Sequence, residues 1–176
     1  MKVALWLLLV LAALGGFDTL YFHEWRARLP ARGPAVRPEL RLHAARDFIY
    51  AVVFATLPWL AWKGAFAGLL AALLAAEIGI TLADFVVEDS VRAPLGGVYP
   101  GERVTHAIMG IVYGSFLAFL VPHLARWWGE PSGMALSPVD VPVLVRAAMA
   151  VMALGVLLSG VRDLMAAYPR PTATTR

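Results

Sequence analysis

Five long apolar stretches, separated by short polar segments, dominate the pattern of residues along the chain. They cover approximately residues 3–25, 44–62, 64–88, 104–124 and 142–166. Each is close to the roughly 20 residues that a helix needs to cross a bilayer. We therefore predict an all-α membrane protein, a bundle of five transmembrane helices in which the second and third helices form a hairpin that turns at Lys63 and Gly64. Residues 1–168 would form this single bundle, and residues 169–176 a flexible tail.

The first apolar stretch begins like a signal peptide, with Lys2 ahead of a leucine-rich segment. Its apolar character nevertheless continues beyond the small residues at Gly15 and Gly16 to Phe22. We therefore expect this stretch to be a transmembrane helix that is not cleaved.

Arginines predict the orientation of the bundle. Eleven of the fifteen basic residues would lie on one side of the membrane: Arg26, Arg28, Arg32, Arg37, Arg41, Arg46, Arg92, Arg103, Arg162, Arg170 and Arg176. The positive-inside rule then places the N-terminus outside and the C-terminus inside. We expect an integral, multi-pass protein of a bacterial inner membrane, with the arginine-rich side in the cytoplasm.

Composition agrees with the membrane class and narrows the chemistry. Hydrophobic residues make up 60% of the chain and charged residues 15%, and the mean hydropathy is +0.71. The net charge of +3 does not indicate nucleic-acid binding, because the arginines lie in loops that flank the membrane. Cysteine is absent, so any metal must be bound by nitrogen and oxygen ligands, which suit iron, manganese or zinc.

Acidic and imidazole side chains recur at helical spacing in and beside the apolar stretches. An ionisable side chain in the bilayer core costs about 2.5–3.5 kcal/mol on insertion scales, so such residues have a partner or a function. The polar faces of the second, third and fourth stretches contain His43 and Asp47, then Glu77, Asp84 and Glu88, then Glu102 and His106. The end of the first helix, the start of the second, the end of the third and the start of the fourth must share one membrane face. We therefore expect the polar faces to converge at one depth.

A converging set of carboxylates and imidazoles predicts a dinuclear metal site. Ferritin-like di-iron bundles use single glutamates and Glu-x-x-His pairs; here Glu102 and His106 are four apart, so only the coordination chemistry is similar. The predicted metal ligands are His23, His43, Asp47, Glu77, Asp84, Glu88, Glu102 and His106, and the predicted second-shell or alternative ligands are Asp18, Glu24 and Arg162. We expect Arg162 to form a buried ion pair with Asp163, and the other arginines to contact lipid phosphates.

The predicted site favours a membrane metalloprotein with two metal ions, most simply iron, that acts with dioxygen on a lipophilic substrate. Zinc or manganese are alternatives. The chain has no nucleotide or flavin motif, so a separate electron donor would be needed. The other functions that we consider are a zinc-dependent membrane hydrolase and a non-enzymatic proton or ion carrier. The expected partners are the lipid bilayer, a lipophilic small molecule and the electron donor, and the Gly-x-x-x-Gly pairs allow a homodimer.

Overall fold

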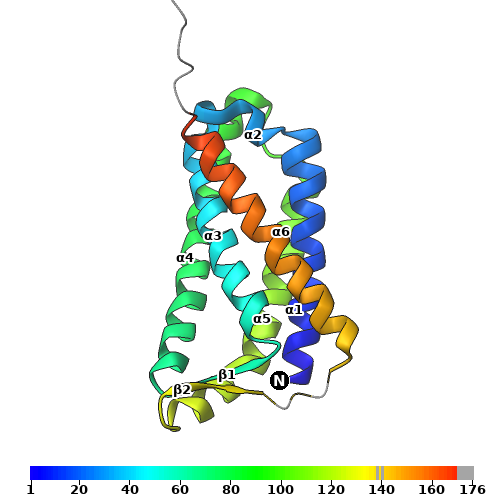
Figure 1. Cartoon of the computed structure of the whole chain (residues 1–176). Coiled ribbons are helices and arrows are strands. Elements are labelled where there is room, and N and C mark those ends of the chain that lie inside the picture. The colour runs from blue at the N-terminus through cyan, green and yellow to red at the C-terminus, as the bar shows by residue number, and fades with distance from the viewer. Residues whose placement is uncertain (138, 140, 170–176) are drawn as a thin grey trace, which may run out of the picture.

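Long helices run along the whole length of the molecule (Figure 1). The computed structural model describes residues 1–137, 139 and 141–169. Its long helices are α1 (Lys2–Phe17), which continues as the π-helix η1 (Asp18–Arg26), α3 (Arg37–Thr56), α4 (Ala65–Arg92), α5 (Pro100–Trp128) and α6 (Val143–Ala167). All but one residue of the expected flexible tail, 169–176, lies outside the described residues.

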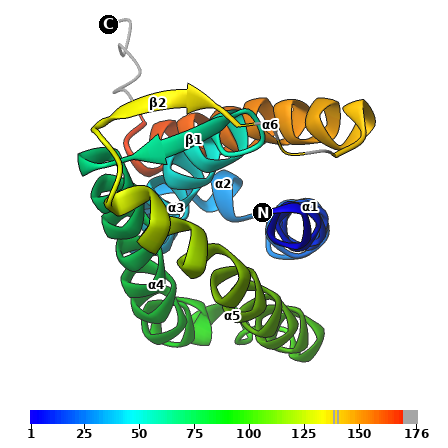
Figure 2. The same cartoon turned by 90° about the horizontal axis from the view of Figure 1, so that it is seen from below.

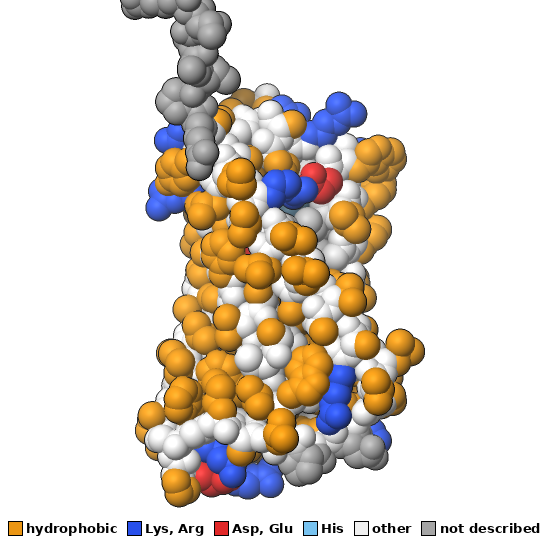
Figure 3. Space-filling model, in the orientation of Figure 1, with side chains coloured by type: hydrophobic (Ala, Val, Ile, Leu, Met, Phe, Trp, Pro, Cys, Tyr) orange, Lys and Arg blue, Asp and Glu red, His pale blue; other side chains and the backbone are white. Residues whose placement is uncertain are grey.

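Among the described residues, four helical segments are long and apolar enough to cross a membrane: Lys2–Arg26, Ala65–Leu95, Pro100–Trp128 and Val143–Ala167. Their outward side chains are apolar, as at Val86, Ile111 and Val151, each about 70% exposed. On the face in Figure 3, hydrophobic side chains cover the middle of the molecule, and Lys and Arg gather toward its two ends. An apolar surface of this extent is typical of contact with lipid, and together with the four apolar helices it fits a multi-pass membrane protein.

Helix α3 differs from the other four because its first half is charged, with Arg37, Glu39 and Arg41 in its first turns. It packs against α4 on one side and α6 on the other, and α1 packs beside α5 (Figure 2). One face of the polar half of α3 is therefore covered by other helices, and the buried residues on it include Glu39 and His43, whereas Arg37 and Arg41 are exposed.

The expected helical hairpin at Lys63 and Gly64 is wrong. Helix α3 begins at Arg37 rather than near residue 44. It ends at Thr56, because Pro58 has no N–H with which to continue the hydrogen bonding of the helix. Residues Leu60–Lys63 form a strand, β1, that pairs antiparallel with β2 (Gly133–Leu136), with Leu60 opposite Leu136. Gly64, at a φ of +55°, then turns the chain into α4. The connection between α5 and α6 thus contains a strand.

The two ends of the bundle have different connections. The β1–β2 ribbon lies at the end that also holds the N-terminus, and the short helices α2 (Leu29–Arg32) and η2 (Gly33–Val36) lie at the opposite end (Figure 1). The turn after α4, which contains the short helix η3 (Ala93–Leu95), is at the α2 end as well. Helix α6 ends there too, so the N-terminus and the end of α6 lie at opposite ends of the molecule.

Candidate metal centre

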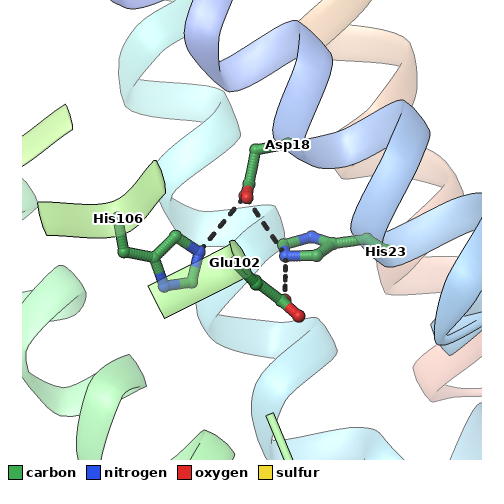
Figure 4. A group of neighbouring side chains, drawn as sticks. All are labelled: Asp18, His23, Glu102 and His106. Carbon is green, nitrogen blue, oxygen red and sulfur yellow. Dashed lines mark hydrogen bonds and ion pairs between the residues drawn. The ribbon is translucent and has the colours of Figure 1, made fainter. Parts of the chain in front are cut away.

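Four potential metal ligands meet near the α2 end of the bundle. Asp18 and His23 come from η1, and Glu102 and His106 come from the first turns of α5. One ligand atom of each residue lies within 4.8 Å of the corresponding atoms of the other three. All four side chains are buried, with at most 7% of any residue exposed. In Figure 4 the Asp18 carboxylate points toward both imidazoles, and Glu102 approaches His23 from the other side.

The π-helical winding of η1 brings Asp18 and His23 together. In an α-helix, residues five apart are about 140° apart around the axis, so these two side chains would face different neighbours. A π-helix has i→i+5 hydrogen bonds, which bring residues five apart nearly above one another. Short π-helical segments are frequent at functional sites, and this segment continues from Asp18 to Arg26.

Helix α5 presents its two ligands from consecutive turns. Pro100 occupies the first turn, where its fixed φ suits a helix start and its missing N–H is not needed. Glu102 and His106 are four residues apart and therefore lie on one face of the helix. This face is turned toward the interior of the bundle, since both residues are buried.

The distances within the group are close to hydrogen-bonding range. The Asp18 Oδ2 atom is 3.3 Å from Nε2 of both His23 and His106, and His23 Nε2 is 3.1 Å from Glu102 Oε1. On its other side, His106 Nδ1 is 3.7 Å from Glu88 Oε1. One carboxylate oxygen thus faces two imidazole nitrogens, an arrangement that either a proton or a metal ion would stabilise.

A second group of ligand-type residues surrounds His43 of α3. Its Nε2 atom is 3.2 Å from Asp84 Oδ2 and 3.8 Å from Glu39 Oε1, and its Nδ1 atom is 3.8 Å from Asp163 Oδ2. The ring of His43 stacks on that of His23, with centroids 4.5 Å apart. The groups around His43 and around His106 are therefore adjacent parts of one buried cluster.

Two arginines belong to the same cluster. Arg92, which is 2% exposed, donates from Nε to Glu39 Oε1 and from Nη1 to Glu102 Oε1, each at 2.7 Å, and its Nη2 also contacts Glu39. Arg46 Nη1 is 3.4 Å from Asp84 Oδ2. Arg92 joins the carboxylates of the two groups and offsets part of their charge.

Unsatisfied polar atoms concentrate in this cluster. Among the described residues, eleven buried side-chain nitrogen or oxygen atoms have no hydrogen-bond partner, and eight of them lie here. They belong to Asp18, His23, Glu39, His43 (both nitrogens), Asp84, Glu88 and His106. A buried polar atom without a partner costs about 1–3 kcal/mol. Carboxylate oxygens and imidazole nitrogens are also metal ligands, so this donor set fits bound cations.

The formal charge of the cluster agrees with this chemistry. It contains six carboxylates, those of Asp18, Glu39, Asp84, Glu88, Glu102 and Asp163, and the guanidinium groups of Arg46 and Arg92. With neutral imidazoles and ionised carboxylates, the formal charge of these eight groups is −4, not counting the partly exposed Arg162 that contacts Asp163. Two divalent cations would neutralise it, and uncompensated buried charge is strongly unfavourable.

Most of the residues predicted from the sequence meet in this cluster. Six of the eight predicted metal ligands lie in the cluster: His23, His43, Asp84, Glu88, Glu102 and His106. Asp18, predicted only as a second-shell or alternative ligand, is one of the four closest residues. Asp47 is partly exposed and lies against α6, where its Cβ would be 3.0 Å from a Cβ on Gly160.

Glu77 lies outside the cluster. It is on the same face of α4 as Asp84, but seven residues earlier, which is about 10 Å along the helix axis. There its Oε1 atom accepts hydrogen bonds from the hydroxyls of Tyr50 and Thr81, each at 2.9 Å. Glu24 also lies apart, because it pairs with Arg162 on the partly exposed side of η1.

The expected roles of two arginines are reversed in the structure. Arg162 contacts Asp163 at 3.3 Å as expected, but its side chain is 46% exposed, so the pair is not buried on both sides. Arg92, expected to contact lipid phosphates, is buried in the cluster. Glu39 was missed altogether, because its position in an arginine-rich segment gave no signal that tertiary packing would enclose it.

Comparisons with known proteins give no relative, since no protein-family model, curated protein or solved structure matches the chain significantly. The fold and the site alone define the class: a multi-pass helical membrane protein with a buried Asp/His/Glu/His cluster that could hold a metal ion.

Proposed function

We propose that this protein is an integral-membrane metalloprotein with a dinuclear centre. The first ion would be held by Asp18, His23, Glu102 and His106, and the second by the group around His43. The observation that carries the proposal is the convergence of four buried ligand atoms within 4.8 Å, beside a third histidine, His43, which stacks on His23. The concentration of unpaired ligand atoms and the formal charge of −4 support two divalent ions rather than one.

For this centre we propose iron and an oxidoreductase that uses dioxygen. A nitrogen- and oxygen-rich donor set suits iron, with manganese and zinc as alternatives. Bound iron would supply the redox chemistry, and the helices around the centre would exclude water and position the substrate. A substrate that enters from the bilayer would be lipophilic. Reduction of dioxygen also requires electrons, which a separate donor protein or small molecule would provide.

A zinc hydrolase is the second candidate, and one observation favours it. Three of the four closest ligands, two imidazoles and one carboxylate, would hold a single zinc ion with its fourth position open for water, and the remaining carboxylate would serve as the general base. In that case the group around His43 would be a buried hydrogen-bonded network rather than a second metal site. Elemental analysis of protein purified without chelator separates the two: two irons per chain support the first candidate, one zinc supports the second, and no metal contradicts both.

The proposed topology places the metal centre near the cytoplasmic side of a bacterial inner membrane, with five crossings and the N-terminus outside. The excess of arginines around the α2 end supports it. Because the chain has no cysteine, single cysteines can test it. In intact cells a membrane-impermeant maleimide should label Glu130→Cys, near the β1–β2 ribbon. Arg103→Cys should be labelled only after the membrane is permeabilised. The opposite pattern would reverse the topology.

A further inference from the structure

A crevice of about 430 Å³ opens between α1, η1, α3 and α6. This volume is within the range of pockets that bind small molecules. Small residues create the space, since Gly15, Gly16 and Gly155 line it and a Cβ on Gly155 would meet no atom within 4 Å. The crevice is therefore a hollow in a wall of helices.

The crevice faces lipid on its outer side. Leu20, Val151 and Leu158 line it, and each is at least 60% exposed on the apolar surface of the molecule. In Figure 1, α6 crosses the bundle obliquely while α1 continues straight into η1, so the two helices diverge toward the α2 end. A hydrocarbon chain in the bilayer can enter between them without passing through water.

The inner end of the crevice reaches the edge of the proposed metal centre. Asp18, whose carboxylate lies between His23 and His106, lines the crevice, and so does Arg46, which contacts Asp84. The crevice thus connects the bilayer to one of the four closest ligands.

Charges along the crevice indicate the kind of head group that it can hold. Three carboxylates line it, those of Asp18, Glu24 and Asp47, and two guanidinium groups, those of Arg46 and Arg162. Both arginines are already paired, Arg46 with Asp84 and Arg162 with Glu24. The crevice has an excess of acid, which disfavours an anionic phosphate or carboxylate head and leaves acceptors for a hydroxyl group.

We propose that this crevice binds an uncharged single-chain lipid with a hydroxyl head, and that this lipid is the substrate class of the metal centre. Its head lies beside Asp18 and Arg46, and its tail lies between α1 and α6. The assignment of the lipid as substrate rests on the proposed metalloenzyme function; the binding site itself does not.

A second crevice provides a matched control. It has a volume of about 300 Å³, lies between α4 and α5, and reaches His106. A Cβ on Gly114, which lines it, would also meet no atom within 4 Å. Gly155→Leu and Gly114→Leu therefore each fill one crevice without a clash at Cβ. Both replace glycine by a better helix former, so both variants should fold.

The test is photo-crosslinking of the full chain in phosphatidylcholine nanodiscs with hexadecanol that carries a mid-chain diazirine. Mass spectrometry should find adducts on α1 and on α6 near residues 151–159. Gly155→Leu should lower this labelling roughly tenfold, because its side chain displaces about two methylene groups of the tail. Gly114→Leu should leave it unchanged. Unlabelled hexadecanol should compete, and hexadecanoate should compete much less.

Three results would overturn the proposal: adducts on α4 and α5 that Gly114→Leu abolishes, adducts spread evenly over the lipid-facing helices, or equal competition by hexadecanoate. Metal content is measured on the same samples. If metal binds but the amount of labelling is the same in Gly155→Leu as in the wild type, the crevice proposal fails and the metal centre stands. If Gly155→Leu lowers the labelling but no metal binds, the lipid site stands and the proposed metalloenzyme fails.

Discussion

Replacement of Arg92 by leucine should destabilise the protein strongly in the absence of metal. The guanidinium group is buried and donates to Glu39 and Glu102, which are 0% and 1% exposed. Arg92→Leu keeps most of the apolar packing of the stem but leaves two buried carboxylates without their cation. Removal of one partner from a buried ion pair costs about 3–5 kcal/mol. We expect a loss of this size in the free energy of unfolding.

The measurement is denaturant-induced unfolding in detergent, followed by circular dichroism, with a chelator present. The control is Arg103→Leu, whose partner Asp89 and own side chain are both mostly exposed, and an exposed pair contributes at most about 1 kcal/mol. Added divalent metal should stabilise Arg92→Leu more than it stabilises the wild type, because a bound cation replaces the missing charge. Equal effects of the Arg92 and Arg103 substitutions would show that Arg92 does not hold a buried carboxylate pair.

Two further substitutions test features outside the cluster. Tyr50→Phe removes a hydroxyl that donates a hydrogen bond to buried Glu77. It should lower the free energy of unfolding by about 1–3 kcal/mol and leave the metal content unchanged. Loss of metal would place Glu77 in the coordination sphere. Gly64→Ala should lower the free energy of unfolding by about 1–3 kcal/mol, because φ of Gly64 is +55° and the new Cβ would lie 2.6 Å from Ser132 Cα. Gly79→Ala, where a Cβ meets nothing within 4 Å, should be neutral or stabilising, and equal effects at both glycines would contradict the geometry of this turn.

The position of the site could be predicted because chain connectivity alone decides which helix ends share a membrane face. Glu88 near the end of α4 and Glu102 and His106 at the start of α5 are separated by one short connection. They had to lie at the same end of the bundle, and they do. The spacing of polar residues also predicted correctly that they face the interior.

Depth and helix winding could not be predicted in the same way. A 3.6-residue period places Glu77 and Asp84 on one face, about two turns apart, but it does not show at which of these two depths the cluster lies. The same period assigns Asp18 and His23 to different faces. Only the π-helical winding of η1 unites them, and no sequence signal marked it.

Tertiary packing determined the features of the fold and the cluster that local sequence patterns did not indicate. Glu39 lies in a polar, arginine-rich segment that looked like a membrane-flanking loop, and the start of α3 is buried only because other elements enclose it. Pro58 was a local signal for the early end of α3, but the apolar residues after it hid the β1 strand. The sequence thus predicted the end of the bundle at which these residues gather better than it predicted which residues belong to the cluster.

The most direct test of the central claim compares two histidines of α5. His106 contacts Asp18 and Glu88 inside the cluster, whereas His123 contacts the N-terminal amine and Arg126 at the other end of the helix. Iron, manganese and zinc per chain are measured for the wild type, His106→Ala and His123→Ala after dialysis against a competing chelator. Loss of even a residue that only supports a ligand costs about 10–100-fold in metal affinity. We expect His106→Ala to lose at least about 100-fold and His123→Ala to match the wild type. Undiminished metal in His106→Ala would contradict the assignment of this cluster as a metal centre.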